Sequence, residues 1–222
     1  MGGFPTSREY LIATIESFWK WFAENSDNLK ALYESGRLED LTRKTGRELD
    51  KIEPQLAWEM GPGKKQAYLF TISGEGNPEL REIANLIVQL APKLKGWEFY
   101  SSRPSRPAPA VVRLPESGQS FNTTEWEFIP LERPEKGRLD LIIVANQLAG
   151  SERGAALRAV SIYLDQLLGE DTVETWIGEF RVEGSVTAQG KKTYKIAELP
   201  DYLLWATNRE NNPIIKLSDR VQ

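Results

Sequence analysis

Three Trp-Glu pairs are the residues of this sequence whose types and spacing could do chemistry. They are Trp58-Glu59, Trp97-Glu98 and Trp126-Glu127. Neighbouring side chains of a strand point to opposite faces, so a Trp that enters a core places its Glu on the other face. If Glu59 and Glu127 face one cleft, they are candidates for a catalytic acid and base or for binding a cation. Otherwise they are solvated strand residues.

The composition excludes most of the common catalytic chemistry. The 222 residues include no Cys and no His, so thiolate nucleophiles, Ser-His-Asp triads, disulfides and the usual zinc sites are impossible. The segment Gly61-Pro62-Gly63-Lys64 lacks the spacing of a phosphate-binding loop and predicts a hairpin turn instead. Dinucleotide and calcium-binding patterns are missing as well. We therefore expect no metal and no cofactor, and we favour a non-catalytic protein over an enzyme.

Charge and apolar patterning bear on the partner and the location. With 28 basic and 32 acidic residues the net charge is −4, so we expect no nucleic-acid partner. The Pro-rich segment 104–109 and its flanks contribute the candidate binding residues Arg103, Arg106 and Arg113, which could contact an acidic protein; a plain linker is the alternative.

The longest apolar run, residues 139–145, is too short to span a bilayer, and no signal-peptide pattern is present. We expect a cytoplasmic protein that does not associate with membranes.

The elements that must position these residues begin with helices. Apolar residues at three- and four-residue spacing predict helices over residues 7–25, 26–36 and 38–53. We treat residues 1–54 as a helical N-terminal segment, and the aromatic cluster at 18–22 as part of the core.

After residue 54 the same order of elements occurs twice. The first segment predicts strands at 56–60 and 67–73, a helix at 78–91 and a strand at 97–100. The second predicts a strand at Trp126, a strand at 139–145, a helix at 151–168 and a strand at 173–182. We interpret residues 55–102 and 124–183 as two ββαβ repeats.

The expected fold class is therefore α+β, with N-terminal helices followed by two ββαβ repeats. The repeats would form one mixed sheet or two sheets, with helices packed on them. We expect residues 55–222 to form a duplicated domain that makes one compact unit with the N-terminal helices, and a last short helix over 196–206.

Several motifs of the chain resemble a family of bacterial proteins. The matching stretches are Phe18-Trp19-Lys20-Trp21-Phe22, Trp58-Glu59-Met60-Gly61, Ser73-Gly74-Glu75-Gly76, Leu164 to Glu170 and Trp176-Ile177-Gly178. The resemblance covers residues 15–180 and is to Trp- and Gly-rich duplicated α/β proteins, classed as a domain of unknown function. The family has no established activity, so the resemblance assigns no functional residues to this chain. Some proteins of this kind are encoded beside toxin and secretion genes, which favours an interaction or immunity role.

Two functions follow as hypotheses. The first is a bacterial cytoplasmic protein that holds a protein partner, as an immunity protein would, through an acidic or aromatic surface of the duplicated sheet. The alternative is a carboxylate-dependent hydrolase or sugar-binding protein, whose cleft lies between the repeats with Glu59 and Glu127 as acid and base. The oligomeric state is open in both.

Overall fold

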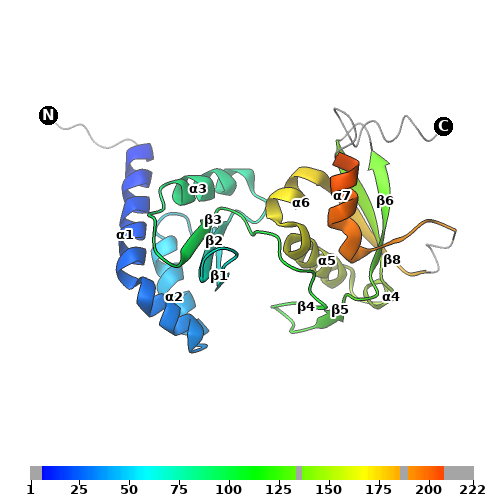
Figure 1. Cartoon of the computed structure of the whole chain (residues 1–222), viewed down its shortest axis with the longest axis horizontal. Coiled ribbons are helices and arrows are strands. Elements are labelled where there is room, and N and C mark those ends of the chain that lie inside the picture. The colour runs from blue at the N-terminus through cyan, green and yellow to red at the C-terminus, as the bar shows by residue number, and fades with distance from the viewer. Residues whose placement is uncertain (1–6, 134–136, 186–189, 208–222) are drawn as a thin grey trace. The chain divides into compact units, whose positions relative to one another are not determined.

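The computed structural model describes residues 7–133, 137–185 and 190–207. The chain divides into two compact units between Arg103 and Pro104 (Figure 1). Each unit has its own large apolar core. The division falls at the Pro-rich segment, and the N-terminal helices belong to the first unit together with the first sheet. None of the helices in the described ranges combines the length and apolarity needed to cross a membrane.

The first unit is a three-stranded sheet covered by helices. Its elements are α1 (Ser7–Glu34), α2 (Leu38–Leu49), β1 (Ala57–Pro62), β2 (Tyr68–Ser73), α3 (Pro78–Gln89) and β3 (Trp97–Tyr100). The strand order is β1-β2-β3, with β1 antiparallel and β3 parallel to β2. Aromatic residues of α1 pack on one face of this sheet: the Phe22 ring lies 5.0 Å from that of Phe70 and 4.9 Å from that of Trp97.

Helix α1 is longer than its sequence suggests. A break at Asn25-Ser26 was predicted, but α1 continues to Glu34. The Asn25 side chain donates to the Trp21 carbonyl one turn earlier, at 2.8 Å, and so does not compete for the helix end. The buried stripe also continues through this point, from Phe22 to Leu29 and Leu32. Burial of the apolar stripe therefore outweighs the local cap signal, and the helix ends near Gly36, which has a φ of +69°.

The second unit contains a four-stranded and a two-stranded sheet. Its elements are β4 (Val111–Arg113), β5 (Ser120–Asn122), β6 (Glu127–Arg133), β7 (Arg138–Val144), α4 (Asn146–Ala149), α5 (Arg153–Leu168), α6 (Glu170–Trp176), β8 (Ile177–Glu183), β9 (Tyr194–Lys195), a 3-10 turn (Ile196–Glu198) and α7 (Leu199–Thr207). The larger sheet has the order β8-β7-β6-β9. Strands β7 and β8 are parallel, whereas β6 is antiparallel to both of its neighbours.

The predicted strand at 173–182 is wrong in its first four residues. Residues 170–176 form α6, and β8 begins only at Ile177. Gly169 ends α5 with a φ of +84°, and its carbonyl then accepts the Val173 N–H to start a new helical turn. Val173 and Trp176 pack against the core from this turn. Residues three apart lie on the same face of a helix, whereas they lie on opposite faces of a strand. The spacing of Val173 and Trp176 therefore fits the helix that is observed.

The α+β class is confirmed, with helices at the N-terminus and mixed sheets in both units. The segments β1-β2-α3-β3 and β6-β7-α5-β8 share a strand order and the same strand directions. Of the two arrangements left open by the sequence, the described strands adopt a separate sheet for each segment. That the two segments descend from one duplicated unit stays a prediction.

Candidate functional site

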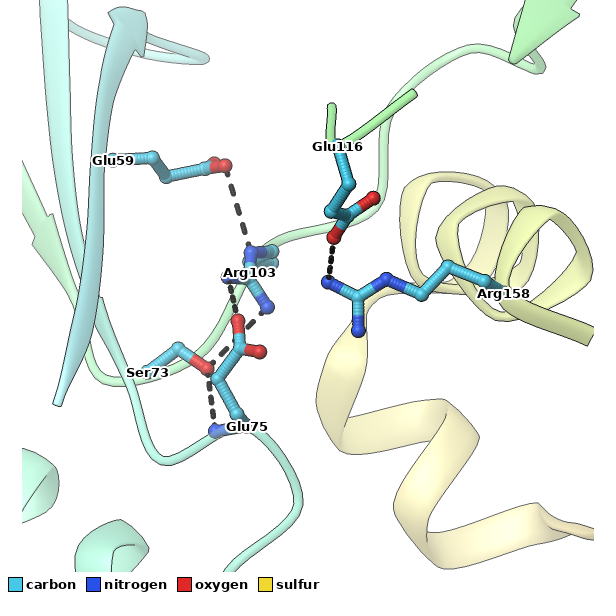
Figure 2. A network of polar contacts seen from close by, with 6 residues as sticks. All are labelled: Glu59, Ser73, Glu75, Arg103, Glu116 and Arg158. Carbon is cyan, nitrogen blue, oxygen red and sulfur yellow. Dashed lines mark hydrogen bonds and ion pairs between the residues drawn. The ribbon is translucent and has the colours of Figure 1, made fainter. Parts of the chain in front are cut away.

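Arg103, which follows β3, contacts polar side chains of β1, of β2 and of the loop after β2 (Figure 2). Its Nε lies 3.6 Å from Glu59 Oε2, and its Nη1 donates to Ser73 Oγ at 3.5 Å. Its Nη2 forms an ion pair with Glu75. Ser73 Oγ also accepts the Glu75 N–H at 2.9 Å. Arg103 thus joins β1, the end of β2 and the loop before α3, so this candidate binding residue is engaged within its own unit.

Glu98, the acid of the second Trp-Glu pair, holds the turn between β1 and β2. Its carboxylate accepts the backbone N–H groups of Lys64 and Lys65, the latter at 3.2 Å. Its partner Trp97 is buried in the first core. The amides that a phosphate-binding loop would offer to a ligand are therefore bound to a carboxylate of the chain itself.

Glu127 lines a pocket of about 320 Å³ in the second unit. The pocket lies where the parallel strands β7 and β8 end, which is the edge where open α/β sheets commonly bind ligands. Lys195 Nζ lies 3.3 Å from Glu127 Oε1 and 3.7 Å from Glu125 Oε2, and Glu125 also lines the pocket. The hydrogen bond to Glu127 raises the pKa of Lys195 above its ordinary value. The site carries two carboxylates and one cation.

Three amide side chains complete the polar wall of this pocket. Asn146 Oδ1 accepts the Ser185 N–H at 2.8 Å, and Asn122 Oδ1 accepts the Thr124 N–H at 2.9 Å. Gln147 Oε1 accepts the Asn122 N–H at 3.2 Å. Because a backbone N–H can only donate, these bonds fix each amide with its oxygen toward the loop. These hydrogen bonds use the oxygen of each amide and leave its NH₂ group out.

The two carboxylates predicted as an acid and base belong to different units. Glu59 lies on β1 and contacts Arg103, whereas Glu127 begins β6 and contacts Lys195. Each side chain is 31% exposed. Among the described residues there is no group of three or more acidic side chains placed to hold a metal ion.

The remaining candidate arginines lie in the second unit and do not join the pocket. The Arg106 N–H donates to the Gln166 carbonyl at 2.6 Å, which ties the Pro-rich segment to the end of α5. Arg113 is exposed on β4. A third arginine, Arg158 of α5, pairs with Glu116 at 2.8 Å, as Figure 2 shows.

Sequence reasoning missed an aromatic ladder formed by Phe128, Tyr194, Tyr202 and Trp205. Ring centroids of successive members lie 5.2–5.4 Å apart, from Phe128 through Tyr194 and Tyr202 to Trp205. Phe128 is fully buried, and the ladder reaches Trp205 on α7, where Trp205 is 46% and Leu204 60% exposed. The spacing of Tyr202 and Trp205, three residues on a helix, was the available signal. Strand β9, which brings in Tyr194, has only two residues and shows no periodicity.

Comparison of the chain with protein-family models, with curated proteins and with solved structures gave no match. The resemblance of its Trp and Gly motifs to the bacterial family described above therefore gains no support.

Proposed function

We propose that this chain is a bacterial, cytoplasmic binding protein without catalytic activity, which holds a protein partner through the aromatic ladder of its second unit. The observation that carries the proposal is the pair of large apolar residues, Leu204 and Trp205, that α7 exposes at the end of the ladder. Protein interfaces are enriched in Trp and Tyr, which bury a large area at a low cost in side-chain entropy.

The ladder also suits binding because its outer rings are supported from within. Trp205 packs on Tyr202, and Tyr202 packs edge-on against buried Phe128 with centroids 5.5 Å apart. Lys192 Nζ lies 4.8 Å from the Tyr194 ring, which adds a cation at the rim. A preorganised apolar surface loses less side-chain freedom when a partner covers it.

The carboxylates support a non-catalytic role. The hydrolase alternative needs Glu59 and Glu127 to act on one substrate, yet each is engaged by a cation of its own unit. One observation favours the hydrolase as a second candidate function, because Glu127 lines a pocket. The hydrolase reading fails if changing both Glu59→Gln and Glu127→Gln leaves every measured activity intact.

The experiment is a pull-down from the host lysate at low salt, with the full chain immobilised. The variant is Leu204→Ser with Trp205→Ser. The matched control is Val111→Ser, which removes an apolar residue that is 54% exposed in the same unit. We expect the wild type and the control to retain a reproducible partner and the double variant to lose it. No reproducible partner, or equal capture by all three proteins, would count against the proposal.

A further inference from the structure

We propose that the pocket between β6, α4 and the end of β8 binds a neutral polyhydroxylated ligand such as a saccharide. This inference is independent of the proposed protein partner, because it uses other residues of the second unit. It begins from the pocket itself, whose volume of about 320 Å³ is at the lower end of the range for small-molecule sites.

The hydrogen-bonding groups of the pocket are mixed in a way that fits hydroxyl groups. Glu125 and Glu127 can only accept, whereas the NH₂ groups of Asn122, Asn146 and Gln147 can only donate. A sugar hydroxyl both donates and accepts, so one ligand can engage both kinds of group. The oxygens of the three amides are already bonded to backbone or side-chain donors of the loops, which presets the donors before a ligand arrives.

Trp126 forms a buried part of the pocket lining, so its indole can report on a ligand bound there. Trp126 is 2% exposed, and its Nε1–H has no hydrogen-bond partner among the described residues. Val144 and Ala145 belong to the apolar part of the lining, which can contact the C–H groups of such a ligand.

The charges of the pocket disfavour the two ionic ligand classes. Two carboxylates and one ammonium leave a net negative charge, which repels phosphates and carboxylates. A cationic ligand would have to compete with Lys195, which already lies within 4 Å of both Glu125 and Glu127. A neutral ligand meets neither obstacle.

The test is a titration of the full ¹⁵N-labelled chain, followed by NMR, with glucose, N-acetylglucosamine and maltose added separately. Arginine and inorganic phosphate serve as the cationic and anionic probes. We expect at least one saccharide to shift the Trp126 indole N–H and the side-chain NH₂ signals of Asn122, Asn146 and Gln147 in a saturable way. A shift of these signals by arginine or phosphate alone, or by none of the probes, would overturn the proposal.

A conservative variant separates ligand binding from the structure of the loop. In Asn146→Asp the remaining oxygen still accepts the Ser185 N–H, but the NH₂ donor is replaced by an acceptor. We expect saccharide affinity to fall by about tenfold or more. Gln147→Glu makes the same exchange and serves if Asn146→Asp does not fold. Gln119→Glu makes the same charge change at an exposed position outside the pocket and should bind as the wild type. Equal affinity in all these proteins would exclude the pocket as the site.

Discussion

Asp140 lies on β7, an inner strand of the four-stranded sheet, and shows what a single residue contributes to this fold. The apolar run 139–145 is interrupted by this acid, whose side chain is nearly fully buried at 2% exposure. Two residues of β8, Gly178 and Glu179, lie opposite Asp140, which makes a β-bulge. Asp140 Oδ1 accepts the Glu179 N–H at 2.8 Å, so the carboxylate satisfies an amide that the bulge removes from the ladder. A side chain on Gly178 would collide with the same oxygen.

Replacing this carboxylate should destabilise the second unit. In Asp140→Ala the Glu179 N–H loses its charged acceptor, and we expect the free energy of unfolding to fall by about 1.5–3 kcal/mol. Asp140→Asn keeps an oxygen at the same position and should lose less. Urea unfolding monitored by circular dichroism measures both variants. Equal midpoints for the wild type and Asp140→Ala would show that the bulge does not depend on this bond.

Tyr163 of α5 provides a pH-dependent contribution to stability. Its side chain is 1% exposed, and burial raises its pKa from 10.0 to about 12. The unfolded chain therefore loses this proton at a lower pH than the folded chain does. The stabilisation is complete below pH 10 and is lost as the pH rises toward 12. We expect the unfolding midpoint of Tyr163→Phe to fall less than that of the wild type across this window. Parallel decreases in the two proteins would contradict the assignment.

At the level of elements, the chain could be predicted wherever one local pattern determines one structure. Helix α3 begins at Pro78 as expected because Asn77 caps it, accepting the N–H groups of Glu79 and Leu80. The sequence also predicts the strand at 97–100, and it predicts β7 at 139–145, one residue later than its observed position. The errors at residues 25–26 and 173–176 occur where burial of a side chain outweighs a local signal. Two element boundaries also differ from the prediction: Trp126 precedes β6, and Gly61 and Pro62 belong to β1 and not to the turn. The pocket could not be predicted because Glu127, Asn146 and Ser185 come together only through the pairing of β6, β7 and β8.

Two glycines of the first unit should respond to the same substitution with opposite signs. Gly46 lies inside α2, where an added Cβ would meet only Trp58 Nε1, at 4.0 Å. Gly46→Ala should therefore raise the free energy of unfolding by about 0.5–1 kcal/mol, because Ala loses less conformational entropy in a helix. Gly74 joins β2 to the loop before α3, and its added Cβ would lie 2.7 Å from the Arg81 N. Gly74→Ala should destabilise the unit, because backbone atoms cannot move aside cheaply.

Thermal unfolding of the two alanine variants measures this pair of effects. An upward shift for Gly46→Ala together with a downward shift for Gly74→Ala is the expected result. A downward shift for both would show that α2 does not tolerate the added methyl group. No change for Gly74→Ala would show that the loop after β2 rearranges without cost.

For the whole molecule, the central feature is that each unit has its own large apolar core, and that among the described residues the two cores share no buried residue. The core of the first unit draws its residues from Ile15 to Trp97, and that of the second from Val112 to Leu203. From the sequence, residues 1–54 were expected to be a helical segment that makes one compact unit with the domain after it. The aromatic residues of α1 pack directly on β2 and β3, and the division into compact units lies between Arg103 and Pro104.

The separate cores predict that residues 1–103 and 104–222 fold independently. Each segment retains its own sheet and the helices that bury its apolar face, so each meets the requirement for autonomous folding. We expect both separately expressed segments to show dispersed amide NMR spectra and cooperative unfolding. We also expect Gly74→Ala to shift only the transition of the first segment, and Asp140→Ala only that of the second. A segment that is unfolded alone but folds when the other is added would show that stability crosses the boundary at Arg103 and Pro104.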